Sequence, residues 1–127
     1  MRILITGGAG FVGSNLASLY REKYPKAVIV AFDNLKRRGS ELNVPILRSK
    51  GIEFHHGDIR SPADFESLKG SFDLFIEASA EPSVLAGTQG DSPMYAIETN
   101  LFGTVHALEY ARRHCGAMVF LSTSRVY

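Results

Sequence analysis

The chain has 127 residues, of which 45% are hydrophobic and 21% charged, and its formal net charge is +1. This length suits one domain with a buried core, and the near-neutral charge argues against nucleic acid or a membrane as the main partner. No apolar run approaches the roughly 20 residues that cross a bilayer, and the single cysteine, Cys115, excludes an internal disulfide framework, so we expect a cytoplasmic protein.

Five short apolar runs alternate with helical patterns and predict parallel strands covered on both faces. The predicted strands are Arg2–Thr6, Ala27–Phe32, Ile52–His55, Asp73–Ala78 and Ala117–Ser122. The predicted helices are Phe11–Tyr24, a short one within Glu41–Lys50, Pro62–Lys69 and Pro93–His114. The alternation predicts an α/β fold, a doubly wound parallel sheet in three layers with right-handed crossovers.

Three prolines define where the predicted helices begin. Ser61–Pro62 and Ser92–Pro93 each place a serine cap before a proline at the first helical position. Pro45 confines the second helix to a start near Asn43, because a proline is tolerated only in the first turn.

A glycine-rich turn, residues 6–13, joins the first strand to the first helix. Gly7 would allow a tight turn, Gly10 would let N–H groups approach a pyrophosphate, and Gly13 would let the helix pack closely. The helix N-terminus adds unsatisfied N–H donors and partial positive charge. Asp33 follows 20 residues after Gly13, where its carboxylate would accept hydrogen bonds from the adenosine ribose. The pattern predicts a dinucleotide site on a Rossmann-type fold, with a glycine-rich turn of another α/β protein as the alternative.

Ligands of such sheets bind beyond the carboxyl ends of the strands. The groups of residues expected there are Thr6–Gly13, Asp33–Arg38, Gly57–Ile59, Ala78–Pro82 and Ser122–Thr123. The second group contains the densest positive charge, residues 36–38, which we interpret as a solvated face, with a phosphate-facing loop as the alternative.

Several motifs give the chain a family resemblance. The glycines are spaced G-x-x-G-x-x-G, and the further motifs are Asp33-Asn34-Leu35, Gly57-Asp58-Ile59-Arg60, Asn100 to Thr104 and Ser122 to Tyr127. Over essentially its whole length the chain resembles the extended short-chain dehydrogenases/reductases, the NAD-dependent epimerase/dehydratase family of nucleotide-sugar enzymes. Residues 32–39 and 56–60 most resemble its CDP-paratose 2-epimerase (tyvelose epimerase) branch.

The resemblance implies an NAD site built from the loops at this edge of the sheet. Asp33 and Asn34 would hold the ribose, Asp58 would accept the adenine amine, and Asn100 would brace the site. The full set of implied cofactor-binding residues is Gly7, Gly10, Phe11, Val12, Gly13, Asp33, Asn34, Asp58, Ile59, Ser79, Ala80 and Asn100.

Thr123 matches the catalytic Ser/Thr of the family, whose hydroxyl would hydrogen-bond the sugar oxygen as hydride leaves carbon. In isolation, a β-propensity residue ending a strand is the alternative. The family's general base, a Tyr-x-x-x-Lys pair, should follow a few dozen residues later, and Tyr127 matches a non-catalytic tyrosine. We therefore expect residues 1–127 to be an incomplete NAD-binding domain, the N-terminal part of a larger enzyme, that binds cofactor without turnover.

Ser124 and Arg125 stand where sugar 4,6-dehydratases carry Asp-Glu, which favours epimerisation. The expected function is the NAD-binding part of a nucleotide-sugar epimerase that acts by transient hydride transfer. A dehydratase or reductase of the same family and a non-catalytic dinucleotide sensor are the alternatives. NAD is preferred because Asp33 would repel a 2′-phosphate, whereas Arg37 and Arg38 leave NADP open.

Other chemistry-bearing residues have structural interpretations. Glu77 stands where many relatives have histidine; a hydrogen-bonded or solvated strand end is favoured over a substrate contact. We expect His55 and His56 at a strand terminus, with no metal site, and Cys115 to pack near a helix end. The apolar positions Met94, Ile97, Leu101, Val105 and Leu108 recur at helical spacing and predict core or interface. The resemblance implies a homodimer through the helix at residues 93–114.

Overall fold

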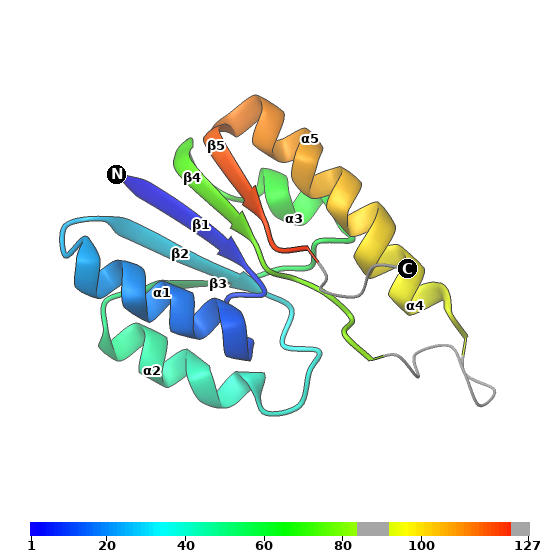
Figure 1. Cartoon of the computed structure of the whole chain (residues 1–127), viewed down its shortest axis with the longest axis horizontal. Helices are drawn as coiled ribbons and strands as arrows, with labels where there is room; N and C mark the ends of the chain where they lie inside the picture. The colour runs from blue at the N-terminus through cyan, green and yellow to red at the C-terminus, as the bar shows by residue number, and fades with distance from the viewer. Residues whose placement is uncertain (84–91, 123–127) are drawn as a thin grey trace.

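The computed structural model describes residues 1–83 and 92–122. One parallel sheet holds five strands in the order β3-β2-β1-β4-β5 (Figure 1). The strands are β1 (Arg2–Thr6), β2 (Val28–Asp33), β3 (Glu53–His56), β4 (Phe72–Glu77) and β5 (Cys115–Phe120). The strand order reverses direction beside β1, which confirms the doubly wound, Rossmann-type fold.

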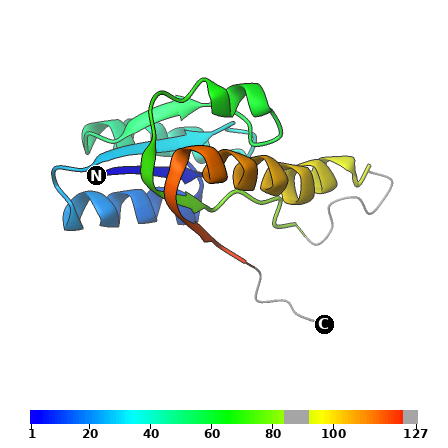
Figure 2. The same ribbon diagram turned by 90° about the horizontal axis from the view of Figure 1, so that it is seen from above.

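Helices cover both faces of the sheet (Figures 1 and 2). The helical segments are α1 (Phe11–Lys23), η1 (Ser40–Leu42), α2 (Asn43–Ser49), α3 (Pro62–Glu66), α4 (Met94–Ile97), η2 (Glu98–Gly103) and α5 (Thr104–His114). The first long helix, α1, packs on β1 and β2 and beside α2, whereas α5 packs on β4 and β5 and beside α3. The three-layer prediction is therefore confirmed.

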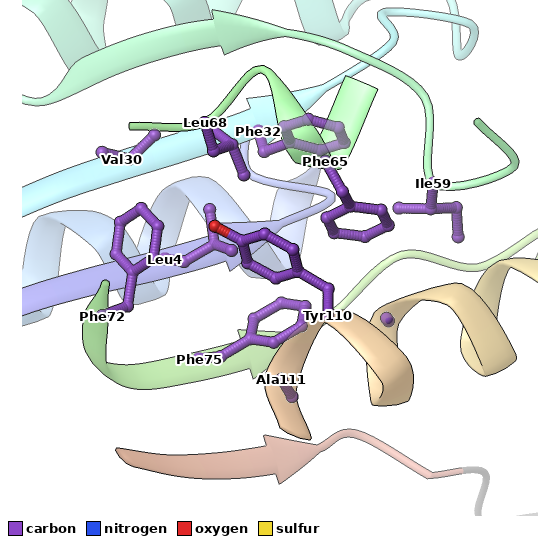
Figure 3. Close-up of a cluster of buried hydrophobic side chains, with 11 residues drawn as sticks. Leu4, Val30, Phe32, Ile59, Phe65, Leu68, Phe72, Phe75, Tyr110 and Ala111 are labelled. Atoms are coloured by element: carbon purple, nitrogen blue, oxygen red, sulfur yellow. The ribbon is translucent and has the colours of Figure 1, made fainter. Parts of the chain in front are cut away.

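Alternate residues of the central strands form two separate cores because successive side chains point to opposite faces. Ile3 and Ile29 lie in the core under α1 and α2. Leu4 belongs to the opposite core, where the rings of Phe65 and Tyr110 stack at a centroid distance of 5.1 Å (Figure 3). These two apolar layers cover the two faces of the sheet, and because the strands are parallel their carboxyl ends lie at one edge.

The helix starts follow the proline signals. The side chain of Ser61 accepts the N–H of Asp64 at 3.3 Å, with Pro62 at the first helical position. The second helix begins at Asn43, with Pro45 in its first turn. At residue 92 the serine oxygen accepts the N–H of Met94 at 3.2 Å, and the helix begins one residue later than predicted.

The predicted helix at residues 93–114 is helical but not uniform. A π-helical segment, η2, lies between α4 and α5. The 3.6-residue apolar repeat does not reveal one widened turn, and π segments are frequent at functional sites. Cys115 begins β5 and does not end the helix. The predicted helix at residues 62–69 ends at Glu66, shortly before Gly70 takes a positive φ of 76°.

One burial prediction is narrowed by the structure and another is wrong. The apolar stripe of the last helix, predicted to be core or interface, is exposed on the described surface and so does not lie in the core; its residues are Met94, Ile97, Leu101, Val105 and Leu108. The strand β5 is not covered on both faces, since neighbouring Val119 and Phe120 are 46% and 47% exposed. Among the described helices α5 packs against β5, which leaves much of this edge strand open.

Within residues 1–83 and 92–122, no helix has the length and apolarity required to cross a membrane.

Candidate functional site

The turn between β1 and α1 depends on glycine at two positions. Gly7 has φ +60°, and a Cβ added there would lie 2.6 Å from the carbonyl oxygen of Ala78. A Cβ at Gly13 would overlap the carbonyl oxygen of Gly7, so the helix can approach the turn only without a side chain. At Gly10 an added Cβ would meet that same carbonyl oxygen at 3.1 Å and no other atom within 4 Å. The outer side of the turn therefore has room for a ligand.

The N-terminus of α1 presents uncapped N–H groups at this turn. Its cap residue is Gly10, which offers no side-chain acceptor, and the first turn contains no acidic residue. The side chains of Phe11 and Val12 are 83% and 48% exposed. Free N–H groups and the helix dipole favour an anion here, so this end of α1 fits a pyrophosphate.

Asp33 closes the turn from the end of β2. Its Oδ2 accepts the N–H of Ala9 at 3.0 Å, and its Oδ1 accepts the N–H of Leu35 at 2.8 Å. The amide of Asn43 donates to the carbonyl oxygen of Ala9 at 2.8 Å, a contact that the sequence analysis missed. Each carboxylate oxygen retains a free lone pair, so Asp33 can also accept a ribose hydroxyl.

Asp58, just beyond β3, is held by two side chains. Its Oδ2 accepts hydrogen bonds from Arg60 at 2.7 Å and from the amide of Asn34 at 2.9 Å. Burial alone raises the pKa of Asp58, but hydrogen bonds from Arg60 and Asn34 outweigh it and lower the pKa to about 2. The carboxylate is therefore ionised and oriented. Both of its oxygens already accept hydrogen bonds, so few lone pairs remain for the adenine amine that the resemblance places here.

Arg60 extends this contact to the last helix, a link that sequence reasoning did not find. Its guanidinium bonds Glu98 of η2 at 3.3 Å and lies 4.7 Å from the ring centroid of Tyr95. The ammonium of Lys36 lies 5.3 Å from the same centroid. Two loops and the last helix thus meet around one aromatic ring, and the pattern of each segment alone gives no signal of it.

Glu77 ends β4 as a buried carboxyl group, 1% exposed. Its Oε2 accepts the hydroxyl of Thr6 at 2.7 Å, and its Oε1 accepts the N–H of Ser79 at 2.7 Å. Burial raises the pKa of Glu77 to about 7, against the opposing effect of these hydrogen bonds. The hydrogen-bonded strand end predicted from the sequence is therefore present, and the carboxyl is buried, not solvated.

The remaining predicted residues lie at different depths. Asn100 braces the loop after β4: its Oδ1 accepts the N–H of Glu81 at 2.8 Å, and its amide donates to the carbonyl oxygen of that residue at 3.1 Å. Ala80 is exposed beside this contact. Ile59 is buried against Gly103 in the core under α5. Thr123 lies outside the described residues.

His55 and His56 end β3, as expected. The ring of His55 stacks on Phe32 at 5.7 Å and bonds the hydroxyl of Ser67 at 2.8 Å. A ring nitrogen of His56 lies 3.2 Å from the carbonyl oxygen of Asn34. Within the described ranges no three His, Cys, Asp or Glu side chains gather as metal ligands. Cys115 packs partly against the core, and burial raises the pKa of its thiol to about 11.

Comparison with known proteins places these features in a family. Residues 3–127 match the model of the NAD dependent epimerase/dehydratase family. The chain is 38% identical to CDP-paratose 2-epimerase of Salmonella typhi, over 100% of this chain and 38% of that protein. It is 31% identical to dTDP-glucose 4,6-dehydratase of Mycobacterium tuberculosis, over 100% of this chain and 38% of that protein.

Solved structures of an epimerase and a dehydratase are similar to this chain as well. ADP-L-glycero-D-manno-heptose-6-epimerase of Helicobacter pylori has a TM-score of 0.82 at 33% identity, with 99% of this chain and 40% of that chain covered. dTDP-glucose 4,6-dehydratase of Bacillus anthracis, in complex with NAD, has a TM-score of 0.75 at 28% identity, with 97% and 37% covered. The chain thus spans about two fifths of the length of these relatives.

Proposed function

Because the chain belongs to the NAD-dependent epimerase/dehydratase family, we propose that it is the dinucleotide-binding part of a nucleotide-sugar epimerase. The observation that carries this proposal is the geometry of the first turn. Gly7 and Gly13 shape it, the uncapped N-terminus of α1 opens onto it, and Asp33 closes it from β2. An anionic pyrophosphate is the group that such a turn stabilises.

The residues around this turn have distinct binding roles. The N–H groups at the start of α1, beginning with Phe11 and Val12, would donate to the pyrophosphate. Asp33 would accept hydrogen bonds from the adenosine ribose, and its negative charge would disfavour a 2′-phosphate. Asn34 and Asp58, already hydrogen-bonded to each other at 2.9 Å, would form the wall beside the adenine. These roles favour NAD over NADP.

NAD+, when bound, supplies the acceptor for the hydride that leaves a sugar carbinol carbon. The hydroxyl of Thr123 would hydrogen-bond the sugar oxygen as that carbon becomes a ketone and the hydroxyl proton passes to the family's general base, the Tyr-x-x-x-Lys pair. It would do so again when the hydride returns to the other face and the base gives the proton back. Asn100, through its two hydrogen bonds to Glu81, would hold the loop after β4 in place during both steps. The sugar ends with the mass it began with.

Epimerisation is preferred over dehydration because Ser124 and Arg125 occupy the positions at which the dehydratases carry acid residues. The test is to incubate the natural protein that contains this chain with a panel of nucleotide sugars and NAD+, and to analyse products by chromatography and mass spectrometry. A new isomer of unchanged mass supports an epimerase. Loss of one water contradicts it and indicates a dehydratase, whereas NAD+ binding without any product indicates a binding protein.

The proposed assembly is a homodimer through the last helix. The exposed apolar face comprises Met94, Ile97, Leu101, Val105 and Leu108, and Phe102 beside it is 49% exposed. An exposed apolar face of this kind is typical of a protein–protein interface.

A further inference from the structure

A buried carboxyl group lies directly beneath the proposed pyrophosphate turn. Glu77 is paired with Thr6 across β4 and β1, and each strand ends at that pair. Gly7 follows Thr6 at once and packs against Ala78, since a Cβ on Gly7 would lie 2.6 Å from the carbonyl oxygen of Ala78. The Glu77 carboxyl group therefore bonds the residue that precedes Gly7, and the residue that follows Glu77 packs against Gly7 itself.

The surroundings of Glu77 can accept either of its protonation states. In the ionised state the hydroxyl of Thr6 donates to Oε2 and the N–H of Ser79 donates to Oε1, both at 2.7 Å. In the neutral state Oε2–H can donate to the same hydroxyl. That hydroxyl can then donate to the carbonyl oxygen of Ile76, which it already approaches at 3.4 Å. Both states keep every hydrogen bond of the carboxyl, so they differ chiefly in charge.

We propose that Glu77 couples dinucleotide binding to proton uptake, with its neutral form favouring the pyrophosphate at the adjoining turn and its ionised form opposing it. This inference rests on the proposed function. The physical reason is Coulombic: two negative groups close together in a partly desolvated site repel each other. Burial supports this coupling because it raises the pKa of Glu77 to about 7. Near neutral pH, a nearby negative charge is then enough to change whether the carboxyl group is protonated.

The groups paired with or bonded to Glu77 in the sheet and the following loop are uncharged. They are Thr6 on β1, Phe120 on β5 and Ser79 on the following loop. On the helix that covers this face of the sheet, the titratable side chains include Glu98 of η2, which pairs with Arg60, and His106 of α5, which bonds the carbonyl oxygen of Ile59. Other titratable side chains at this edge are more distant in the strand order. Asp33 ends β2 on the far side of β1, His56 ends β3 beyond it, and Glu81 lies further along the loop. His56 is the histidine at the end of a neighbouring strand, so it has its own control.

The experiment titrates the 127-residue chain with NADH, whose dihydronicotinamide is uncharged, and follows NADH fluorescence from pH 6 to pH 8.5. We expect the affinity of the wild-type chain to fall on the order of tenfold across this range. Glu77→Gln reproduces the neutral acid: its amide can donate to Thr6 while its oxygen accepts from Ser79. This variant should bind equally at both ends of the range, as tightly as the wild type does at pH 6. His56→Asn should keep the wild-type dependence.

A flat wild-type profile, a dependence that persists in Glu77→Gln, or one that disappears in His56→Asn would overturn the inference. Far-UV circular dichroism establishes that each variant is folded. If Glu77→Gln does not fold, a second measurement uses the wild-type and His56→Asn chains. Calorimetry of NADH binding at pH 7, in buffers of different ionisation enthalpy, gives the number of protons taken up on binding. Proton uptake in both supports the coupling, and its absence overturns it. A folded wild-type chain that binds neither NADH nor NAD+ at any pH contradicts the proposed function itself.

Discussion

The guanidinium of Arg60 lies 2.7 Å from the carboxylate of Asp58 and 3.3 Å from that of Glu98, so one cation joins the loop after β3 to the last helix. The same guanidinium lies over the ring of Tyr95. Asp58 also accepts the amide of Asn34 from the end of β2. The adenosine side of the proposed site is thus assembled by contacts between three segments that lie far apart in the sequence.

Arg60→Ala should reduce stability in a pH-dependent way. The pKa of Asp58 is depressed to about 2, so its contribution is present above its unfolded value of 3.8 and is lost as pH falls through about 2. With partial solvent exposure discounted, we expect the unfolding free energy at pH 7 to fall by about 1–2 kcal/mol. Urea denaturation at several pH values measures this difference, which should shrink between pH 4 and pH 2.

The matched control is Arg112→Ala, which breaks an exposed ion pair with Glu109 on the surface of α5. Exposed pairs contribute little, so the control should leave stability unchanged at every pH. Equal losses in the two variants, or a loss in Arg60→Ala that does not vary with pH, would show that Arg60 does not hold Asp58 in its ionised form.

Substitutions in the glycine turn should separate folding from binding. Gly10→Ala meets only one backbone atom, so the chain should keep its stability within about 1 kcal/mol while NAD+ affinity falls by about tenfold or more, because the methyl group occupies the pyrophosphate side. Gly13→Ala overlaps the carbonyl oxygen of Gly7 and should lower the unfolding free energy by at least about 2 kcal/mol. Denaturant unfolding and calorimetric titration give the two quantities.

Gly51→Ala is the control for the turn, since Gly51 has φ +68° and lies remote from it with no atom within 4 Å of an added Cβ. It should cost about 1 kcal/mol through backbone strain and leave NAD+ affinity unchanged. Wild-type affinity in Gly10→Ala would mean that the ligand does not approach the turn from its open side.

The sequence predicts the elements well where the signal is local. The bounds of β1 and the starts of α1 and α3 were predicted to the residue, because an apolar run, a glycine turn and a serine–proline cap each act over a few positions. For the stripe on the last helix the sequence predicted core or interface without deciding between them, since an apolar repeat looks the same whether it faces a core or a partner. Tertiary contacts such as Thr6 with Glu77, 71 residues apart, also leave no local signal.

Tyr110→Phe should not destabilise the chain. The ring of Tyr110 is buried between Phe65 and Phe75 (Figure 3). Its hydroxyl has no hydrogen-bond partner among the described residues. An unsatisfied buried hydroxyl costs free energy, so its removal should raise the unfolding free energy by up to about 1 kcal/mol. Tyr110→Leu should instead lose about 2 kcal/mol or more through lost ring packing. A clear loss in Tyr110→Phe, measured by urea denaturation, would reveal a partner for the hydroxyl.

The apolar face of the last helix should determine the oligomeric state. Leu101 and Leu108 are 57% and 52% exposed, and replacing both by lysine should convert the proposed homodimer to a monomer. Light scattering coupled to size-exclusion chromatography measures the mass. Leu42→Lys, at an apolar site that is 70% exposed on η1, should leave the dimer intact. A monomeric wild type, or a dimer that survives the double substitution, would place the interface elsewhere or exclude it.

Calorimetric titration of the folded chain with NAD+ and NADP+ tests most directly whether the turn between β1 and α1 binds NAD. We predict saturable binding of one NAD+ per chain and weaker binding of NADP+, because Asp33 disfavours a 2′-phosphate. The Arg37→Ala, Arg38→Ala double variant should leave NAD+ affinity unchanged. No saturable binding of either dinucleotide would contradict a dinucleotide site at this turn, and tighter binding of NADP+ that disappears in the double variant would contradict its preference for NAD+.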